Sequence, residues 1–128
     1  MSGYILVVDD QFGVRLLMHK VLEEAGYSVV SVASGSECLN YAVSADRPSL
    51  ILLDYRMPAM TGLQVLSRLS KDDHAKWIPV IMISAESDLE DAARCYGVQK
   101  FLSKPLDLKV LLQTVAETLT ESELKFRT

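Results

Sequence analysis

The sequence lacks most of the features that mark membrane, secreted and low-complexity proteins. It has only two cysteines, Cys38 and Cys95, and their spacing matches no metal-binding or redox motif. No apolar run approaches the ~20 residues that a membrane-spanning helix needs. No signal peptide, internal repeat or low-complexity tract is present. We therefore expect a cytoplasmic protein with reduced thiols and no contact with a membrane.

Basic charge is also scarce. The 128 residues include 13 lysines and arginines against 17 aspartates and glutamates, which gives a formal net charge of −4. Direct nucleic-acid binding is not expected, because it usually requires clustered basic residues. The length and the hydrophobic content of 49% are typical of one globular domain. We assign residues 1–121 to this domain and residues 122–128 to a polar C-terminal tail or the start of a linker.

Short apolar runs alternate along the chain with segments of helical spacing. The runs, which are predicted strands, cover residues 4–8, 28–33, 50–53, 80–83 and 100–103. The predicted helices cover approximately residues 14–25, 34–45, 61–71, 88–96 and 107–119. This alternation predicts an α/β fold, a doubly wound five-stranded parallel sheet with helices on both faces. We expect the flavodoxin-like strand order 2-1-3-4-5.

Helical spacing also predicts which side chains face the core. The inward face of the first helix should include Leu17, and that of the second should include Val43. His19 lies off this face, so we expect it at the solvated surface. Ser34 and Glu37 have the spacing of a capping box at the start of the second helix.

Polar residues follow four of the five predicted strands directly. The first strand ends in Asp9 and Asp10, the third in Asp54 and the fourth in Ser84, while Lys104 follows the fifth. Each residue alone has an ordinary explanation as a turn, a cap or a solvated side chain. The carboxyl ends of parallel strands share one edge, where open α/β sheets bind ligands. We therefore expect these side chains to converge on one cleft, with Asp54 at its floor.

The residue types in this cleft indicate phosphoryl chemistry. Three carboxylates against one lysine leave excess negative charge, which favours a divalent cation. Ligation by oxygen alone suits Mg²⁺, which keeps waters and accepts phosphate oxygens. A carboxylate can act as the nucleophile toward phosphorus, and the phosphoryl oxygens are then neutralised by the metal, a lysine and a hydroxyl donor. Lys104 and Ser84 match the last two requirements.

These residues lie in motifs that resemble the receiver domain of bacterial response regulators over essentially the whole chain. The motifs are Val7–Asp10, Leu52–Pro58 with Gly62, Pro79–Ala85 and Phe101–Pro105. The resemblance implies a signalling domain of a two-component or phosphorelay system. Such a domain takes a phosphoryl group from a histidine kinase or a histidine phosphotransfer protein.

The resemblance also implies roles at the acidic end of the cleft. Asp54 would be the phosphoacceptor. Asp10 and Asp54 would bind Mg²⁺ (or Mn²⁺) directly, Asp9 would act through water, and Arg56 would contribute its backbone carbonyl.

Further roles follow from the same resemblance. Ser84, Ala85 and Lys104 would bind the phosphoryl group, and Ser84 and Phe101 would form the switch. Phe101 stands where tyrosine is frequent, so a hydroxyl is missing there. The switch would act on the face formed by the fourth helix, the fifth strand and the fifth helix, which would contact a partner or an output domain.

Arg56 and Glu86 lie two residues beyond Asp54 and Ser84 respectively, and their charges are opposite. We expect them to flank the mouth of the cleft. They form either a surface ion pair without function or a partial cover that modulates the lifetime of the phosphoryl group.

Three alternative functions agree less well with the sequence. A phosphatase of the haloacid dehalogenase group carries D-x-D at its nucleophile, whereas Arg56 occupies the second position here, and 128 residues leave no room for a cap. A flavodoxin-like cofactor binder needs a phosphate-binding loop where Asp9 and Asp10 stand. A pseudo-receiver would not need the complete set of acids. We therefore expect a non-enzymatic signalling domain, either free-standing or part of a longer regulator.

Overall fold

Strand and helix alternate throughout residues 3–127, the part of the chain that the structure, a computed structural model, describes. The side chains of residues 125–127 are outside this description. The strands are β1 (Ile5–Val8), β2 (Val29–Val32), β3 (Leu50–Asp54), β4 (Val80–Ser84) and β5 (Lys100–Ser103). The helices are α1 (Phe12–Glu24), α2 (Gly35–Ala42), α3 (Gly62–Ser70), the 3₁₀ helix η1 (Ser87–Leu89), α4 (Glu90–Cys95) and α5 (Leu108–Arg127).

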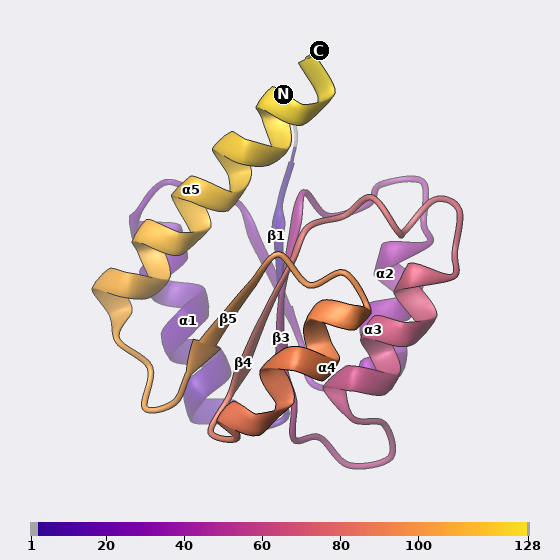
Figure 1. Cartoon of the computed structure of the whole chain (residues 1–128). Coiled ribbons are helices and arrows are strands. Elements are labelled where there is room, and N and C mark those ends of the chain that lie inside the picture. Colours follow the sequence, from indigo (N-terminus) through magenta and orange to yellow (C-terminus); the bar gives the residue numbers. More distant parts are fainter. Residues whose placement is uncertain (1–2, 128) are drawn as a thin grey trace.

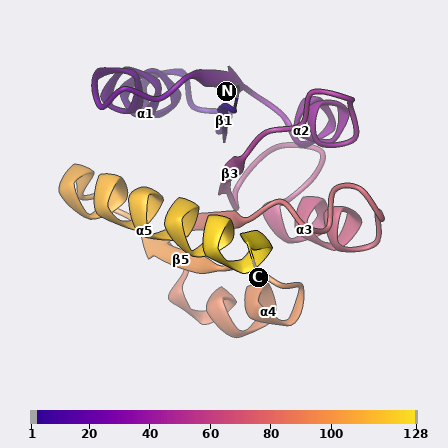
Figure 2. The same cartoon turned by 90° about the horizontal axis from the view of Figure 1, so that it is seen from above.

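The five strands form one parallel sheet in the order β2-β1-β3-β4-β5, which confirms the predicted topology. Helices α1 and α5 cover one face, and α2, α3 and α4 cover the other (Figures 1 and 2). All residues of the three central strands are buried. Burial on both faces explains why these strands appear as continuous apolar runs in the sequence.

The sheet divides the core into two layers, because successive residues of a strand point to opposite faces. In β3, Leu52 packs with Met18 of α1 and Leu111 of α5. Its neighbour Leu53 packs on the other side, with Val65 of α3 among others. The same alternation holds in β1 and β4.

Two inward positions were predicted wrongly. Leu17 is 48% exposed, because α1 packs through Met18 and Leu22, which are one turn apart. Val43 is also exposed, because α2 ends at Ala42 and Val43 is its C-terminal cap. Gly35 and Cys38 are buried residues of α2 that the pattern did not select.

The expectation for His19 also needs correction. Its side chain is only partly exposed, with Nδ1 2.8 Å from the Ser31 hydroxyl and Nε2 3.3 Å from a Glu23 carboxylate oxygen. At the start of α2, Ser34 accepts a hydrogen bond from the backbone N–H of Glu37, as expected. The return bond differs, because Glu37 accepts from the N–H of Ala33 rather than from that of Ser34.

The last helix is longer than the apolar stripe predicts. The stripe ends near Leu119, but α5 continues to Arg127 (Figure 1). The added turns contain good helix formers such as Glu121, Glu123 and Leu124. Glu121 also forms an ion pair of 3.5 Å with Lys100 at the start of β5.

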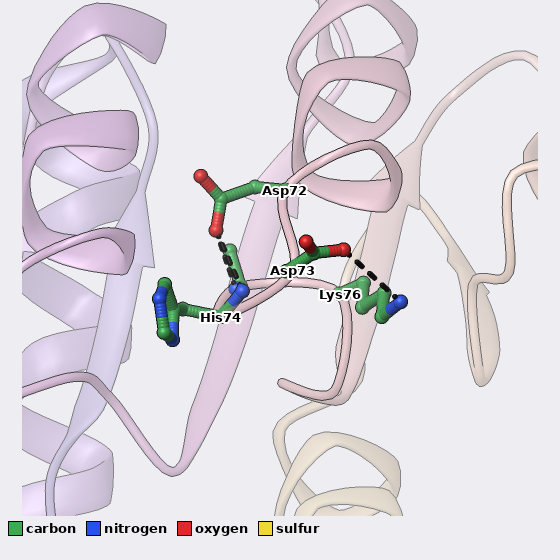
Figure 3. A network of polar contacts seen from close by, with 5 residues as sticks. Asp72, Asp73, His74 and Lys76 are labelled. Carbon is green, nitrogen blue, oxygen red and sulfur yellow. Dashed lines mark hydrogen bonds and ion pairs between the residues drawn. The ribbon is translucent and has the colours of Figure 1, made fainter.

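The connection between α3 and β4 is organised by its own polar side chains (Figure 3). A carboxylate oxygen of Asp72 accepts the backbone N–H groups of His74 and Ala75 at 2.8 and 2.9 Å. These bonds lower the pKa of Asp72, because they favour the ionised form. Asp73 pairs with Lys76 at 3.3 Å. The connection precedes β4, so it lies at the opposite edge of the sheet from the carboxyl ends of the strands.

None of the helices formed by residues 3–127 combines the length and the apolar character that a membrane crossing requires.

Candidate functional site

The strand-end residues converge at the carboxyl edge of the sheet, as the sequence predicts. Asp9 follows β1 and is fully buried, while Asp54 is the last residue of β3 and is 4% exposed. Asp10 is exposed beside them. One carboxylate oxygen from each of these three residues lies within 4.8 Å of the other two. Lys104 brings its ammonium to 2.8 Å from Asp54 Oδ1 and 3.8 Å from Asp9 Oδ2.

The close packing of α3 against the end of β3 fixes the position of Asp54. The backbone N–H of Gly62 donates to the carbonyl of Tyr55 at 2.8 Å. A β-carbon at Gly62 would lie 2.6 Å from the carbonyl oxygen of Asp54. Only glycine permits this approach. Thr61 and Gln64 form a complete capping box, which fixes the start of α3 at Gly62.

Asp9 has one satisfied and one unsatisfied oxygen. Its Oδ1 accepts the backbone N–H of Gln11 at 2.8 Å, whereas its Oδ2 is buried and has no hydrogen-bond partner. Burial raises the pKa of Asp9, and the Gln11 bond and the Lys104 charge oppose this shift only in part. An orphaned buried carboxylate oxygen beside two further carboxylates is a donor set that fits a hard divalent cation.

Asp54 has a similar electrostatic environment. Burial is the main cause that raises its pKa, and the hydrogen bond from Lys104 acts in the opposite direction. The negative charge of Asp9 raises the pKa further. The carboxylates are therefore destabilised by burial and by one another, and a cation between them would relieve both effects.

A cleft of about 560 Å³ opens above these residues. Ser84, Ala85 and Lys104 line it together with Asp10 and Asp54. The Ser84 hydroxyl oxygen accepts the backbone N–H of Glu86 at 2.9 Å. The backbone N–H of Lys104 donates to the carbonyl of Ser84 at 3.0 Å, which joins the ends of β4 and β5.

Arg56 and Glu86 meet across the mouth of the cleft. Arg56 Nη2 donates to Glu86 Oε1, and both residues line the cleft. The Arg56 side chain is 77% exposed, whereas that of Glu86 is 31% exposed. The ion pair expected from their charges and positions is therefore present.

Phe101 does not line the cleft. It lies on β5 opposite Met82 and packs against the layer that contains α3 and α4. Two contacts that hold the acidic cluster were not expected from the sequence. These are the Gln11 N–H bond to Asp9 and the 2.7 Å bond from Arg15 Nη1 to the Asp9 carbonyl. Neither residue type is diagnostic by itself, so no sequence signal marks them.

A larger hollow of about 820 Å³ lies at the other edge of the sheet, beside the segments that precede β1, β3 and β4. Its charged lining includes Asp46, Arg47 and Glu123. All three are exposed, so within the described chain this hollow has no counterpart to the buried carboxylates.

Known proteins are similar to this chain over most of its length. The chain is 31% identical over 119 residues to sporulation initiation phosphotransferase F of Bacillus subtilis, covering 93% of this chain and 95% of that protein. It is 37% identical over 108 residues to the DNA-binding transcriptional regulator NtrC of Klebsiella pneumoniae, covering 83% of this chain but 22% of that protein.

Solved structures are similar as well. A CheY-like response regulator receiver domain protein from Methanospirillum hungatei superposes with a TM-score of 0.89 at 25% identity, over 98% of this chain and 99% of that one. The chemotaxis response regulator CheY4 of Vibrio cholerae gives 0.84 at 30% identity, over 92% and 99%. The family model described as "Response regulator receiver domain" matches residues 5–116. The chain therefore belongs to the response regulator receiver domain family, whose members are signalling domains of two-component systems.

Proposed function

We propose that this domain is the phosphoacceptor of a two-component or phosphorelay system and that Asp54 accepts the phosphoryl group in a Mg²⁺-dependent reaction. One observation supports this above all. Asp54 is a buried carboxylate at the floor of an open cleft, 2.8 Å from the Lys104 ammonium and next to the carboxylates of Asp9 and Asp10.

The acidic cluster would hold the metal. Asp10 and Asp54 would bind Mg²⁺ (or Mn²⁺) directly, Asp9 would act through water, and the backbone carbonyl of Arg56 would complete the protein ligands. The orphaned Asp9 oxygen and the all-oxygen donor set support this assignment. When bound, the cation supplies positive charge that offsets the negative charge of the phosphoryl oxygens.

Asp54, Lys104 and Ser84 would have separate roles in the phosphoryl transfer. A carboxylate oxygen of Asp54 forms a bond to phosphorus while the bond from phosphorus to the donor nitrogen of a phosphohistidine breaks. Lys104, which contacts Asp54 in the unmodified domain, shifts to a phosphoryl oxygen. The Ser84 hydroxyl and the Ala85 backbone N–H donate to the remaining oxygens.

The product carries the signal. The phosphoryl group adds charge near −2 and strong acceptor oxygens. Ser84 moves to donate to it, and Phe101 enters the space that Ser84 leaves, which shifts the population between two packings. The α4–β5–α5 face changes as a result. The reaction modifies the domain itself, so its role is signalling and not turnover of another substrate.

The partners follow from this chemistry. A histidine kinase or a histidine phosphotransfer protein would supply the phosphoryl group, and a downstream protein or an output domain would contact the α4–β5–α5 face. We place the domain in the cytoplasm, without direct contact with a membrane or nucleic acid. Residues 1–121 would form the receiver domain, and residues 122–128 would be its polar C-terminal tail or the start of a linker.

Arg56 and Glu86 would modulate the lifetime of the phosphoryl group. Hydrolysis requires a water to approach phosphorus opposite the Asp54 oxygen. The ion pair lies at the mouth of the cleft, where it would obstruct that approach. Arg56 is also close enough to be attracted by the phosphoryl charge.

The phosphoacceptor assignment is tested by intact-mass measurement after incubation with acetyl phosphate and Mg²⁺. The wild-type protein should gain one phosphoryl group that hydroxylamine removes, and Asp54→Asn should gain none. Asp46→Asn, an exposed position outside the cleft, is the matched control and should label like the wild type. Labelling should also be lost in EDTA. Equal labelling of the wild type and Asp54→Asn would refute the assignment.

A further inference from the structure

A groove between α3 and α4 plays no part in the phosphoryl chemistry described above. The two helices lie next to each other on the same face of the sheet (Figures 1 and 2). The groove has a volume of about 490 Å³. Met60 and Leu63 form one wall, and Ala92 and Tyr96 form the other. Tyr96 is 41% exposed, so a large aromatic face is open to solvent at the rim.

The groove carries positive charge, whereas the net charge of the domain is negative. Arg68 and Lys71 line it, both side chains are exposed, and neither forms an ion pair with a described carboxylate. Among the described residues, no aspartate or glutamate lines this groove. The protein as a whole has a formal charge of −4. The groove is therefore a locally basic site on an acidic domain.

The groove also has a direction. Leu63 lies in α3, and Lys71, eight residues further along the chain, is the C-terminal cap of this helix, about two turns away. Leu63 is in the first turn of α3, near the carboxyl edge of the sheet, while Arg68 is in its last turn. The groove thus runs from an apolar end beside the β3–α3 connection to a basic end at the C-terminus of α3.

We propose that this groove binds an acidic amphipathic helical segment of a partner protein. Apolar side chains of the segment would contact Met60, Leu63 and Tyr96, and acidic side chains one or two turns further along would pair with Arg68 and Lys71. An acidic segment is favoured because it meets two unpaired cations and no competing carboxylate in the groove. The proposal does not depend on the phosphoacceptor role of Asp54.

A simpler role for the two cations is to stabilise α3, because basic residues near a helix C-terminus interact favourably with its dipole. The two roles predict different results. Stabilisation of the helix affects thermal stability alone, whereas a binding role affects the affinity for a segment of defined charge pattern.

The test is fluorescence anisotropy with labelled amphipathic peptides of about 12–16 residues. Two peptides are used. In each, one face of the helix carries leucine in one half and glutamate in the other half, and the two peptides differ in which half comes first. One order should bind saturably and more weakly as salt rises. The double variant Arg68→Glu, Lys71→Glu should weaken binding at least about fivefold. Lys20→Glu, Lys109→Glu, which changes the net charge equally at exposed positions on α1 and α5, should leave binding unchanged.

Two further measurements keep the result unambiguous. Tyr96→Ala should weaken binding without altering its salt dependence, and melting temperatures should verify that each variant is folded. Lack of saturable binding by either peptide, or equal loss in the two charge-reversal pairs, would overturn the proposal. So would self-association in sedimentation that the Arg68→Glu, Lys71→Glu variant abolishes, because a second copy would then occupy the groove.

Discussion

Replacing Gly62 with alanine should destabilise the protein, whereas the same replacement at Gly13 should stabilise it. A β-carbon at Gly62 would lie 2.6 Å from the Asp54 carbonyl oxygen and 2.9 Å from the Tyr55 α-carbon. Both are backbone atoms, so relief requires the end of β3 and the start of α3 to move apart. A β-carbon at Gly13, in the first turn of α1, would meet no atom within 4 Å.

The expected magnitudes follow from these contacts. Overpacking against rigid neighbours typically costs ~1–3 kcal/mol. The conformational advantage of alanine over glycine in a helix offsets ~0.5–1 kcal/mol of that cost. The net loss at Gly62 is therefore about 0.5–2 kcal/mol, which corresponds to a melting temperature lower by roughly 2–10 °C for a domain of this size. Gly13→Ala should add ~0.4–1 kcal/mol.

Urea denaturation followed by circular dichroism measures both effects, with the m-value as a check that unfolding remains two-state. Gly62→Ala should also slow labelling by acetyl phosphate, because the displaced backbone belongs to Asp54. Gly13→Ala should label at the wild-type rate. If Gly62→Ala proved as stable as the wild type, the close approach of α3 to β3 would not constrain the position of Asp54.

Three other predictions concern the cleft. In metal-free protein at pH 7, Asp9→Asn should be more stable than the wild type, because burial raises the pKa of the Asp9 carboxyl above 3.8 in the folded state. Because of this raised pKa, the folded wild type binds protons more readily than its unfolded chain. As the pH falls from the raised pKa toward 3.8, the stability difference between Asp9→Asn and the wild type should therefore shrink. Urea titrations at several pH values measure this difference. Asp10→Ala should remove most of the Mg²⁺ affinity in a calorimetric titration, and an unchanged titration would exclude Asp10 as a ligand. The Mg²⁺ affinity of the wild type should also fall at low pH, as the carboxylates become protonated. Arg56→Asn should shorten the lifetime of the phosphorylated protein after donor removal, with Glu86→Ala having a smaller effect, and identical decay in wild type and Arg56→Asn would leave only a surface ion pair worth ~0–1 kcal/mol.

The sheet and the acidic cluster could be predicted because both depend on short-range signals. The run Leu50–Leu53 is too apolar for an exposed strand, and Asp54 follows it directly. Once the strands are parallel, topology alone brings their final residues to one edge. The ion pair between Arg56 and Glu86 followed from the same logic, since each residue comes just after a strand that ends at the cleft.

Other features could not be predicted because they depend on tertiary contacts. Helical spacing predicts which side of α1 faces the core only to within about one residue. Leu17 was therefore predicted to be buried, although it faces solvent. The length of α5 was missed because its last turns do not continue the apolar stripe. The hydrogen bonds that Gln11 and Arg15 make to Asp9 require the start of α1 to lie over the end of β1. No pattern of residue types in the sequence specifies this placement of α1 relative to β1.

The division of the core into two layers has a consequence for how substitutions combine. Leu111 of α5 and Val65 of α3 belong to different clusters with the sheet between them, so neither shares a packing neighbour with the other. Free energies of substitutions at such separated sites are generally additive. A rearrangement of side chains in one layer can reach the other only by moving strand backbone, which the pairing of each central strand on both sides resists. The sheet thus separates the two layers of core side chains, and destabilising substitutions in one layer should add to those in the other.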